Sequence, residues 1–424
     1  MSSAPESLSP SGAGTSEAAA SANPPLAAAS PAVFLAGFST LALISGISIG
    51  LAKVVTQFFA LAIGADAFQI GLIMAMESIG MVLVTVPAGF IIARFGARRV
   101  YAIASLGPLI VNLLLPFASG IIGLAVGRLV IGLCIPFRIV SMNSTFLAQL
   151  NRIGVGKAGW YRGALTAGLA LIGPALATVL TQHVDYVWSF AIIAALFGIM
   201  AVGSLYFFTD EAPQRSSSST PAPKGLSANG IVSEARGLLR NKDVSESCVI
   251  EFISSATGSL FAAFIIVVAA HLNGLTKEDG VHIMLFHGAM TVLALFGAGR
   301  LTRTLNKWIA YGAGLVLGTL ALIILGTASG FAALAIGAVL LSAGQSIVHL
   351  VNMRLLSTHP GEKSKVSGLF NLSSMTGSSV GALAGGIVSK FAGVQSIYLL
   401  WLPVLWLAAG YLFFVLKGTN PHEA

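Results

Sequence analysis

The sequence predicts an all-α membrane protein, in which twelve transmembrane helices form two pseudo-symmetric bundles of six. Two observations predict this fold class. First, 56% of the 424 residues are hydrophobic and only 9% are charged, a balance outside the range of ordinary soluble domains. Second, apolar runs of about 20 residues, the length that crosses roughly 30 Å of hydrocarbon as an α-helix, recur along the chain.

The apolar runs define the predicted helices in chain order. The first six cover residues 32–63, 68–93, 100–117, 120–147, 161–182 and 187–208. The second six cover residues 247–271, 281–299, 308–327, 331–353, 366–391 and 395–416. Each run is continuously apolar and is bounded by short polar breaks, so each predicts one spanning helix rather than an alternating strand.

The segments outside the spans set the domain organisation. The first 30 residues contain no Lys or Arg and no apolar core, so residues 1–31 are expected to form a disordered cytoplasmic tail and not a cleaved signal peptide. Residues 209–246 form the one long connection and separate a bundle at 32–208 from a bundle at 247–416. Residues 417–424 form a short second cytoplasmic tail.

Part of the long connection has helical periodicity. The apolar residues that recur at this spacing are Ile231, Val232, Ala235, Leu238 and Leu239. They predict an amphipathic helix that lies along the inner membrane surface. A solvated linker with chance periodicity is the alternative.

The net charge of +8 is arranged for a membrane and not for nucleic acid. Of the 23 Lys and Arg residues, only Lys277 and Lys390 fall in loops on the side opposite the termini, and Lys53, Arg128 and Arg138 lie within spans. All the others fall on the side of the termini. By the positive-inside rule, both termini are therefore expected to be cytoplasmic.

The two halves align with each other at one register. Setting residues 141–163 against 346–368 places the fourth and fifth spans on the tenth and eleventh without a gap and with four identities. This register supports a duplicated six-helix unit.

The stretch GFIIARFGARRV at 89–100 interrupts the apolar sequence between the second and third spans. Positive-inside anchoring explains Arg94, Arg98 and Arg99 but not the glycines. We expect Gly89 to let another helix approach closely and Gly96 to permit the tight reversal into the third span. This pattern, placed between the second and third of twelve helices, resembles the signature loop of the major facilitator superfamily of transporters.

Two further elements are similar to that family. Arg128 and Gly132 on the fourth span resemble its Arg-x-x-x-Gly element. Gly173 and Pro174 on the fifth span resemble a Gly-Pro element that is commoner among exporters exchanging substrate for protons. Ala93 stands where the family usually has an acidic residue. The resemblance covers residues 32–416.

The resemblance implies a mechanism as well as a fold. It implies two bundles that rock about a midplane site, with the first, fourth, seventh and tenth helices lining the cavity. It also implies gating roles for Gly89, Arg94, Gly96, Arg98, Arg99, Gly173 and Pro174.

Three cations within spans are candidate substrate contacts. An ionisable group at the bilayer centre costs roughly 2.5 to 3.5 kcal/mol, so Lys53, Arg128 and Arg138 should face a cavity or a partner. The two arginines are about 15 Å apart along one helix and can line one broad face. Snorkelling is the alternative for Lys53, and a structural hydrogen-bonding role is the alternative for Arg128. Because Glu77 is the one clear acid in these spans, an anionic substrate would neutralise the excess charge.

Three residues are candidate proton carriers. Burial favours the neutral form of Glu77 while Lys53 favours its charged form, so movement between two environments could load and release a proton. His349 in the tenth span is the second candidate because an imidazole titrates near neutrality, with a structural hydrogen-bonding role as its alternative. Glu251, nearer the cytoplasmic end of the seventh span, is the third.

The second half also offers neutral polar residues and a glycine series. Gln345 and Asn352, together with His349, are candidate substrate contacts on the tenth span. Gly377, Gly381 and Gly385, at four-residue spacing, predict a close-packing ridge on the eleventh span.

The residues favour a secondary active transporter of a bacterial inner membrane that moves a small organic or amphiphilic anion by alternating access, coupled to protons. A broad-specificity drug/proton antiporter is the alternative, favoured by Gly173 and Pro174. No ATP-binding loop occurs in the sequence, so the energy is expected to come from a gradient. Neither a catalytic constellation nor metal-ligand spacing occurs, so we expect no enzyme activity, metal or cofactor. The protein is expected to act as a monomer in the lipid bilayer.

Overall fold

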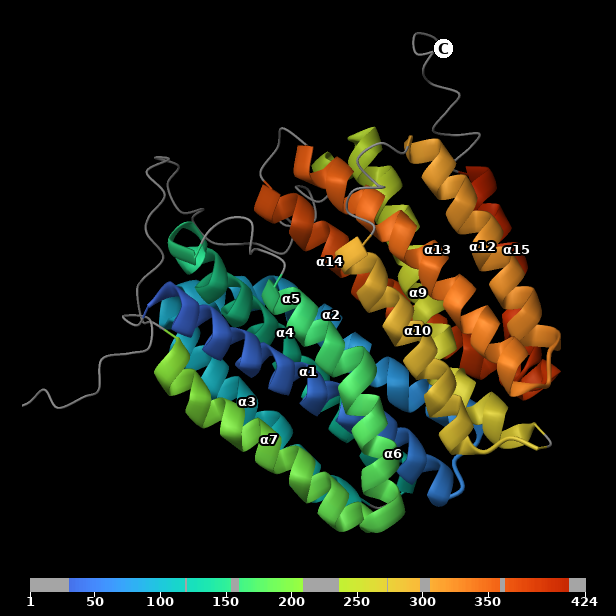
Figure 1. The fold of residues 1–424 in the computed structure, drawn as a ribbon, viewed down its shortest axis with the longest axis horizontal. Coiled ribbons are helices and arrows are strands. Elements are labelled where there is room, and N and C mark those ends of the chain that lie inside the picture. Colours follow the sequence, from blue (N-terminus) through green and yellow to red (C-terminus); the bar gives the residue numbers. More distant parts are fainter. Residues whose placement is uncertain are drawn as a thin grey trace, which may run out of the picture.

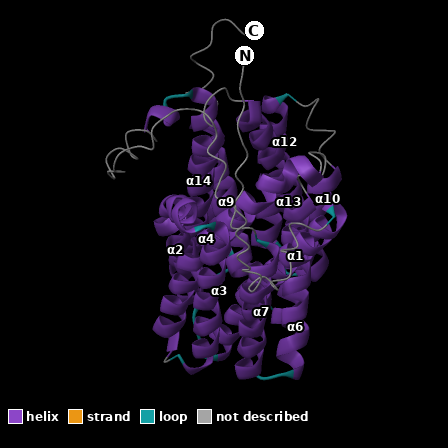
Figure 2. Cartoon of the chain, turned by 90° about the vertical axis from the view of Figure 1, so that its left-hand side faces the viewer, coloured by secondary structure: helices purple, strands orange, loops and turns teal. Residues whose placement is uncertain are grey.

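The computed structural model describes residues 30–118, 120–153, 160–208, 236–272, 274–297, 306–358 and 363–411. Every regular element in these ranges is a helix. The helices form two groups whose long axes diverge toward one end of the molecule (Figure 1), and a side view shows them running roughly alongside one another within each group (Figure 2). The predicted fold class is confirmed.

The first bundle consists of six helical passes. They are α1 (Pro31–Ala62), α2 (Ala67–Phe95), α3 (Ala97–Leu114) with the 3-10 turn η2 (Leu115–Phe117), α4 (Gly120–Ile153), the fifth pass built from α5 (Trp160–Ala167), the π-helical turn η4 (Gly168–Ile172) and α6 (Gly173–His183), and α7 (Tyr186–Phe207). Each pass corresponds to one predicted span.

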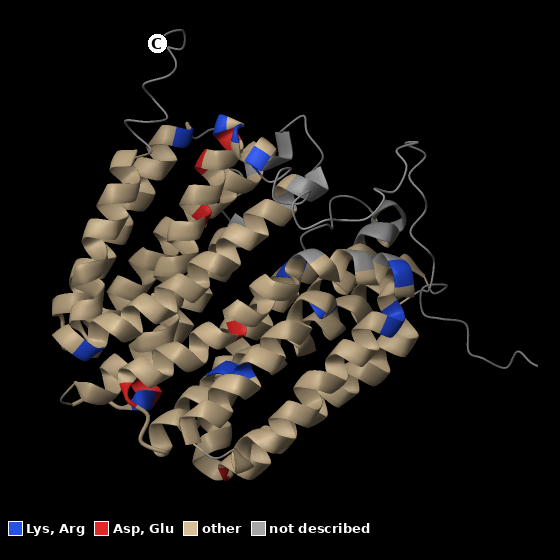
Figure 3. Ribbon diagram, turned by 180° about the vertical axis from the view of Figure 1, so that it is seen from behind, with Lys and Arg blue, Asp and Glu red and all other residues tan. Residues whose placement is uncertain are grey.

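The second bundle repeats this number. Its helices are α9 (Lys242–His271), α10 (Lys277–Gly297), α12 (Lys307–Thr327), α13 (Phe331–Thr358), α14 (Lys363–Ala392) and α15 (Ser396–Tyr411). By length and hydropathy alone, nine helices in the described part of the chain could cross a membrane, and α15 is a shorter apolar helix. Charged residues lie mainly near the helix ends, and a few lie in the middle of helices (Figure 3).

Side-chain caps fix where several helices begin. Asp66 accepts from the backbone of Gln69, whose side chain accepts from Asp66 N–H in return, forming a capping box at the start of α2. Three other helices are capped by one side-chain oxygen that accepts from backbone N–H groups of the first turn: α7 by Asp185, α9 by Asn241 and α12 by Asn306. Such caps satisfy amide groups that the first helical turn leaves without partners. Polar breaks between apolar runs thus become helix starts.

The predicted amphipathic helix at 231–240 lies mostly outside the described residues. Residues 236–239 are helical, and Leu238 packs on a small cluster formed by Val244, Cys248 and Val366. This contact ties the end of the connection to the second bundle.

The two bundles touch from the middle of their helices, where Thr85 Oγ1 lies 3.0 Å from Met375 Sδ, to one end of the molecule. We call the end at which α1 begins and α15 ends the terminal face, and the opposite end the far face. Near the far face, Gln57 Nε2 donates to the Ala262 carbonyl over 3.0 Å, and a Cβ on Gly71 would meet the Ala382 carbonyl at 2.7 Å. Toward the terminal face the bundles spread apart (Figure 1).

Two cation–π contacts also join the bundles at the far face. Lys277 Nζ lies 4.8 Å from the ring centroid of Phe58, and Lys390 Nζ lies 5.8 Å from that of Phe68. Each contact pairs a lysine of the second bundle with an aromatic ring of the first, and each is within the range at which such pairs attract. The structure is therefore closed at the far face.

Candidate functional site

A buried charged cluster joins three helices of the first bundle. Glu77 of α2 forms an ion pair with Arg128 of α4, and its second oxygen, Oε1, lies 3.4 Å from Lys53 Nζ of α1. Glu77 is 2% exposed and Arg128 is 1% exposed. Two cations share one carboxylate, so the cluster carries an excess of one positive charge when all three groups are ionised.

Glycines allow this cluster to form. A Cβ at Gly132 of α4 would collide with the backbone carbonyl of Glu77, and a Cβ at Gly80 of α2 would meet the Leu129 carbonyl. Because neither glycine has a side chain, the two backbones approach closely enough for Arg128 to reach Glu77. The Arg-x-x-x-Gly element therefore combines a cation with the close contact that brings it to its partner.

Lys53 is the accessible member of the cluster. Its side chain is 36% exposed, whereas that of Glu77 is 3% exposed. Lys53 lies one helical turn before Gln57, and positions i and i+4 share a helix face. Because Gln57 contacts Ala262 of the second bundle, Lys53 lies on the side of α1 that faces that bundle.

Arg138 lies inside the first bundle instead. It is 1% exposed, its Nη2 contacts Ser45 Oγ at 3.2 Å and Tyr101 Oη at 3.4 Å, and its guanidinium lies 4.6 Å from the Phe197 ring centroid. These partners belong to α1, α3 and α7, whereas Arg128 is turned toward α2. The two arginines do not share one cavity wall in this conformation, so a substrate contact for Arg138 stays a prediction.

The second bundle has a polar cluster of its own. His349 Nδ1 of α13 lies 3.3 Å from Glu251 Oε2 of α9. Ser255 Oγ donates to Glu251 Oε1 over 3.3 Å and lies 2.7 Å from Ser374 Oγ of α14. The His349 side chain is 36% exposed and that of Glu251 is 7% exposed. One titratable pair is thus partly open to its surroundings.

This polar cluster lies on the face of α9 that is turned toward the first bundle. Glu251, Ser255 and Ala262 are separated by four and seven residues, which places them on one side of a helix. The Ala262 carbonyl accepts from Gln57 of the first bundle. The clusters around Lys53 and around Glu251 therefore border the space between the bundles from opposite sides.

The other two polar candidates on α13 are engaged within the second bundle. Gln345 Nε2 donates to the Ser254 carbonyl over 3.0 Å, and its Oε1 lies 3.3 Å from His287 Nε2. Asn352 is fully buried and accepts from Tyr311 Oη over 2.9 Å. The sequence did not identify Tyr311 as a partner, because an aromatic residue near a helix start is common at a membrane interface.

The loop glycines behave differently from each other. Gly96 has φ 86° and ψ 145° and connects α2 directly to α3, so the predicted tight reversal is confirmed. The predicted close approach at Gly89 is wrong for this conformation, because a Cβ there would have no neighbouring atom within 4 Å. Arg94 and Arg99 are exposed. With the bundles spread apart at the terminal face, no second helix in the described ranges lies against Gly89.

The Gly-Pro element lies at an irregular point of the fifth pass. The π-helical turn η4 ends immediately before Gly173 and Pro174. A Cβ at Gly173 would meet the Ile47 carbonyl and the Leu51 amide nitrogen of α1, both at 2.8 Å. The element therefore permits close packing between the fifth pass and α1. Its predicted gating role stays a prediction.

Comparisons with known proteins agree with this architecture. Solved structures of similar fold include the nucleoside transporter NupG, with a TM-score of 0.74, 14% identity, and coverage of 92% of this chain and 100% of that chain. A bacterial homologue of the human lysosomal transporter Spinster, in an inward-facing and occupied conformation, has a TM-score of 0.70 and 15% identity. The match covers 92% of this chain and 97% of that chain. The human organic anion transporter MFSD10 has a TM-score of 0.61 and 15% identity, and the match covers 91% of this chain and 98% of that chain.

A search of curated proteins gives no match. The family model described as Major Facilitator Superfamily matches residues 32–244 and again residues 247–424. The two matches divide the chain where the two bundles divide. The chain therefore belongs to the Major Facilitator Superfamily.

Proposed function

We propose that this transporter moves a small organic or amphiphilic anion across the membrane by alternating access, coupled to protons. The observation that carries the proposal is the cluster of Lys53, Glu77 and Arg128, in which two cations share one buried carboxylate. An uncompensated charge in a region of low dielectric is costly. A carboxylate or phosphate group bound beside Lys53 would lower that cost.

Accessibility favours Lys53 as the direct contact. Arg128 is buried against α2, so its role is to hold Glu77 and keep the cluster positive. Lys53 lies on the side of α1 that faces the second bundle, and its side chain is partly exposed. We therefore assign substrate contact to Lys53 and a positioning role to Arg128.

The polar cluster of the second bundle is the candidate for proton coupling. Glu251 and His349 are both titratable and share one short contact, and Ser255 also donates to Glu251. A proton bound by this pair would change the charge facing the first bundle. Glu77, the first candidate that the sequence offered, is the alternative, since a substrate anion beside Lys53 would compete with it for the same cation.

The closed far face supports the alternating-access part of the proposal. Gln57 and Lys277 make contacts between the bundles near that face. A substrate could then exchange with the side of the membrane at which the bundles spread apart. If the positive-inside topology is correct, that side is the cytoplasm.

A binding screen tests the anion assignment. In detergent, at least one compound from a panel of small carboxylates and organic phosphates should raise the thermal unfolding midpoint, because a ligand that binds only the folded state stabilises it. We expect Lys53→Gln to weaken that binding about tenfold, equivalent to about 1.4 kcal/mol. The control Arg236→Gln, at an exposed position, should bind as the wild type does. Stabilisation by cationic drugs alone would contradict the proposal and favour the drug/proton antiporter.

Reconstitution into proteoliposomes tests the proton coupling. In Glu251→Gln, transport driven by a pH gradient should be lost, whereas exchange of labelled for unlabelled substrate without a gradient should persist. The reason is that an amide cannot take up or release a proton but can keep the hydrogen bond from Ser255. The control Glu278→Gln changes an acid at the start of α10 and should keep gradient-driven transport. Retention of full gradient-driven transport in Glu251→Gln would exclude this pair as the coupling site.

A further inference from the structure

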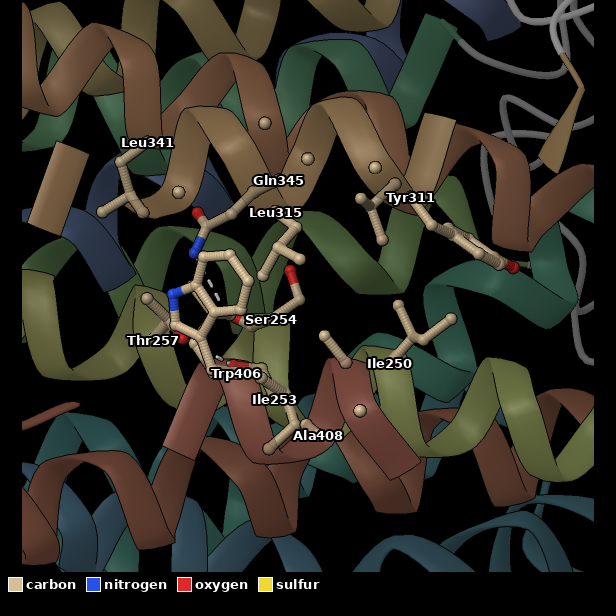
Figure 4. Close-up of a pocket in the computed structure, with 18 of the residues that line it drawn as sticks. Ile250, Ile253, Ser254, Thr257, Tyr311, Leu315, Leu341, Gln345, Trp406 and Ala408 are labelled. Carbon is tan, nitrogen blue, oxygen red and sulfur yellow. Dashed lines mark hydrogen bonds between the residues drawn. The ribbon is translucent and has the colours of Figure 1, made fainter. Parts of the chain in front are cut away.

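The second bundle encloses a cavity of about 420 Å³ between α9, α12, α13 and α15. Figure 4 shows its lining, in which Leu341, Gln345, Leu315, Ile253 and Trp406 surround one open space. Gly312 of α12 and Gly410 of α15 add no side chain to this lining, and a Cβ on either would have no neighbour within 4 Å. We propose that this cavity binds one acyl chain of a bilayer phospholipid, independently of the transported substrate.

The lining is mostly apolar, which favours an apolar ligand. The polar side chains of Thr257, Tyr311 and Gln345 in this lining already have partners within the protein. Gln345 Nε2 donates to the Ser254 carbonyl over 3.0 Å, and Tyr311 Oη donates to Asn352 over 2.9 Å. Thr257 Oγ1 donates to the Ile253 carbonyl over 2.8 Å and accepts from Trp401 Nε1 over 2.9 Å. A ligand would find few polar atoms to pair with, so a hydrocarbon chain suits the cavity better than a polar solute.

The length and depth of the cavity match one leaflet. Its lining on α12 runs from Trp308, the second residue of that helix, to Gly318. Ten residues of helix rise about 15 Å, which is half of the roughly 30 Å of bilayer hydrocarbon. Trp308 lies near the terminal face, and tryptophan is enriched at membrane interfaces. A chain entering there would end near the bilayer midplane, as an acyl chain of the adjoining leaflet does.

The cavity is open at its rim. Trp406 is 54% exposed, and Gly312 is exposed with no atom within 4 Å of the position that a Cβ would take. The same helices carry apolar side chains on the outside of the bundle, including Ile309 at 62% and Val316 at 56% exposure. These side chains would lie in lipid, so the nearest molecules to the opening are phospholipids.

The site lies beside the proposed proton-coupling pair, on the same two helices. Ile250 and Val348 line the cavity, and each precedes one member of that pair, Glu251 or His349, by a single residue. Adjacent residues of a helix point in directions about 100° apart. An acyl chain would therefore pack against α9 and α13 on faces that adjoin those holding the pair.

Native mass spectrometry with added palmitoyl-oleoyl phosphatidylglycerol tests this site. The wild type should retain one phospholipid through a detergent titration that strips the others. In Gly312→Leu, the added Cβ would meet no neighbouring atom within 4 Å; we expect the larger side chain to take up part of the cavity and to weaken retention about tenfold. The control Val316→Leu enlarges a lipid-facing residue of the same helix outside the cavity and should retain phospholipid as the wild type does.

Gly410→Leu tests the wall formed by α15 and replaces Gly312→Leu if that variant does not fold. A Cβ at Gly410 would also have no neighbour within 4 Å. Equal retention by the wild type and the filled variants would show annular lipid only and overturn the proposal. Retention of detergent in preference to phospholipid would overturn it as well. Because lipid retention is measured without substrate or a proton gradient, this result is independent of the proposed transport function.

Discussion

Replacing Glu77 by alanine is expected to destabilise the protein by about 3 to 5 kcal/mol, the usual cost of leaving a buried cation without its partner. Arg128 is 1% exposed and forms its ion pair with Glu77. Without the carboxylate, the guanidinium would keep its charge where water does not reach it. Lys53, with a side chain that is 36% exposed, could rehydrate and would add little to the loss. Equilibrium unfolding in mixed micelles measures the difference from the wild type.

A second substitution separates the ion pair from simple loss of packing. Combining Glu77→Ala with Arg128→Met removes both charges, so the double variant should recover more than half of the lost stability. Glu278→Ala, which breaks a peripheral pair with Lys277 at 3.9 Å, should cost less than about 1 kcal/mol. A double variant less stable than Glu77→Ala alone would show that Arg128 is stabilised by groups other than the carboxylate.

The sequence predicted the spans well because hydropathy along one helix is a local property. Each apolar run became one helical pass, and Gly96 made the predicted reversal between α2 and α3. Gly89 was predicted to contact another helix, but its contacts depend on the separation of the bundles at the terminal face. A single sequence does not specify which conformation of a two-state transporter is formed, so that prediction had no local basis.

The candidate site was predicted residue by residue, and the one pair that was predicted, Lys53 with Glu77, is confirmed. Glu251 and His349 were separate predictions, although each lies nine residues from the terminal-face end of its helix, α9 or α13. Equal depth suggests a possible contact but does not say which helices are neighbours. Arg138 shows the same limit, because its position in the sequence fixes its depth on α4 but not the choice between α2 and α3 as its neighbour.

The glycine ridge of α14 connects helix packing to the second polar cluster. A Cβ at Gly377 would collide with the Phe252 carbonyl of α9, and a Cβ at Gly381 would collide with the Ala256 carbonyl. The predicted close packing is therefore confirmed. It also holds Ser374 of α14 2.7 Å from Ser255 of α9, and Ser255 donates to Glu251. Any side chain on the ridge would push α14 away from this cluster.

Gly381→Leu should therefore lower the unfolding free energy by about 3 kcal/mol or more, because an overpacked contact between two backbones cannot relax locally. Gly368→Leu, on the same helix, is the matched control: a Cβ there would have no neighbour within 4 Å, and leucine favours a helix over glycine by up to about 1 kcal/mol. Thermal unfolding and the yield of monodisperse protein measure the stability of the two variants. Equal stability of the two variants would mean that α9 and α14 can separate without loss, and that Ser374 does not depend on the ridge for its place beside Ser255.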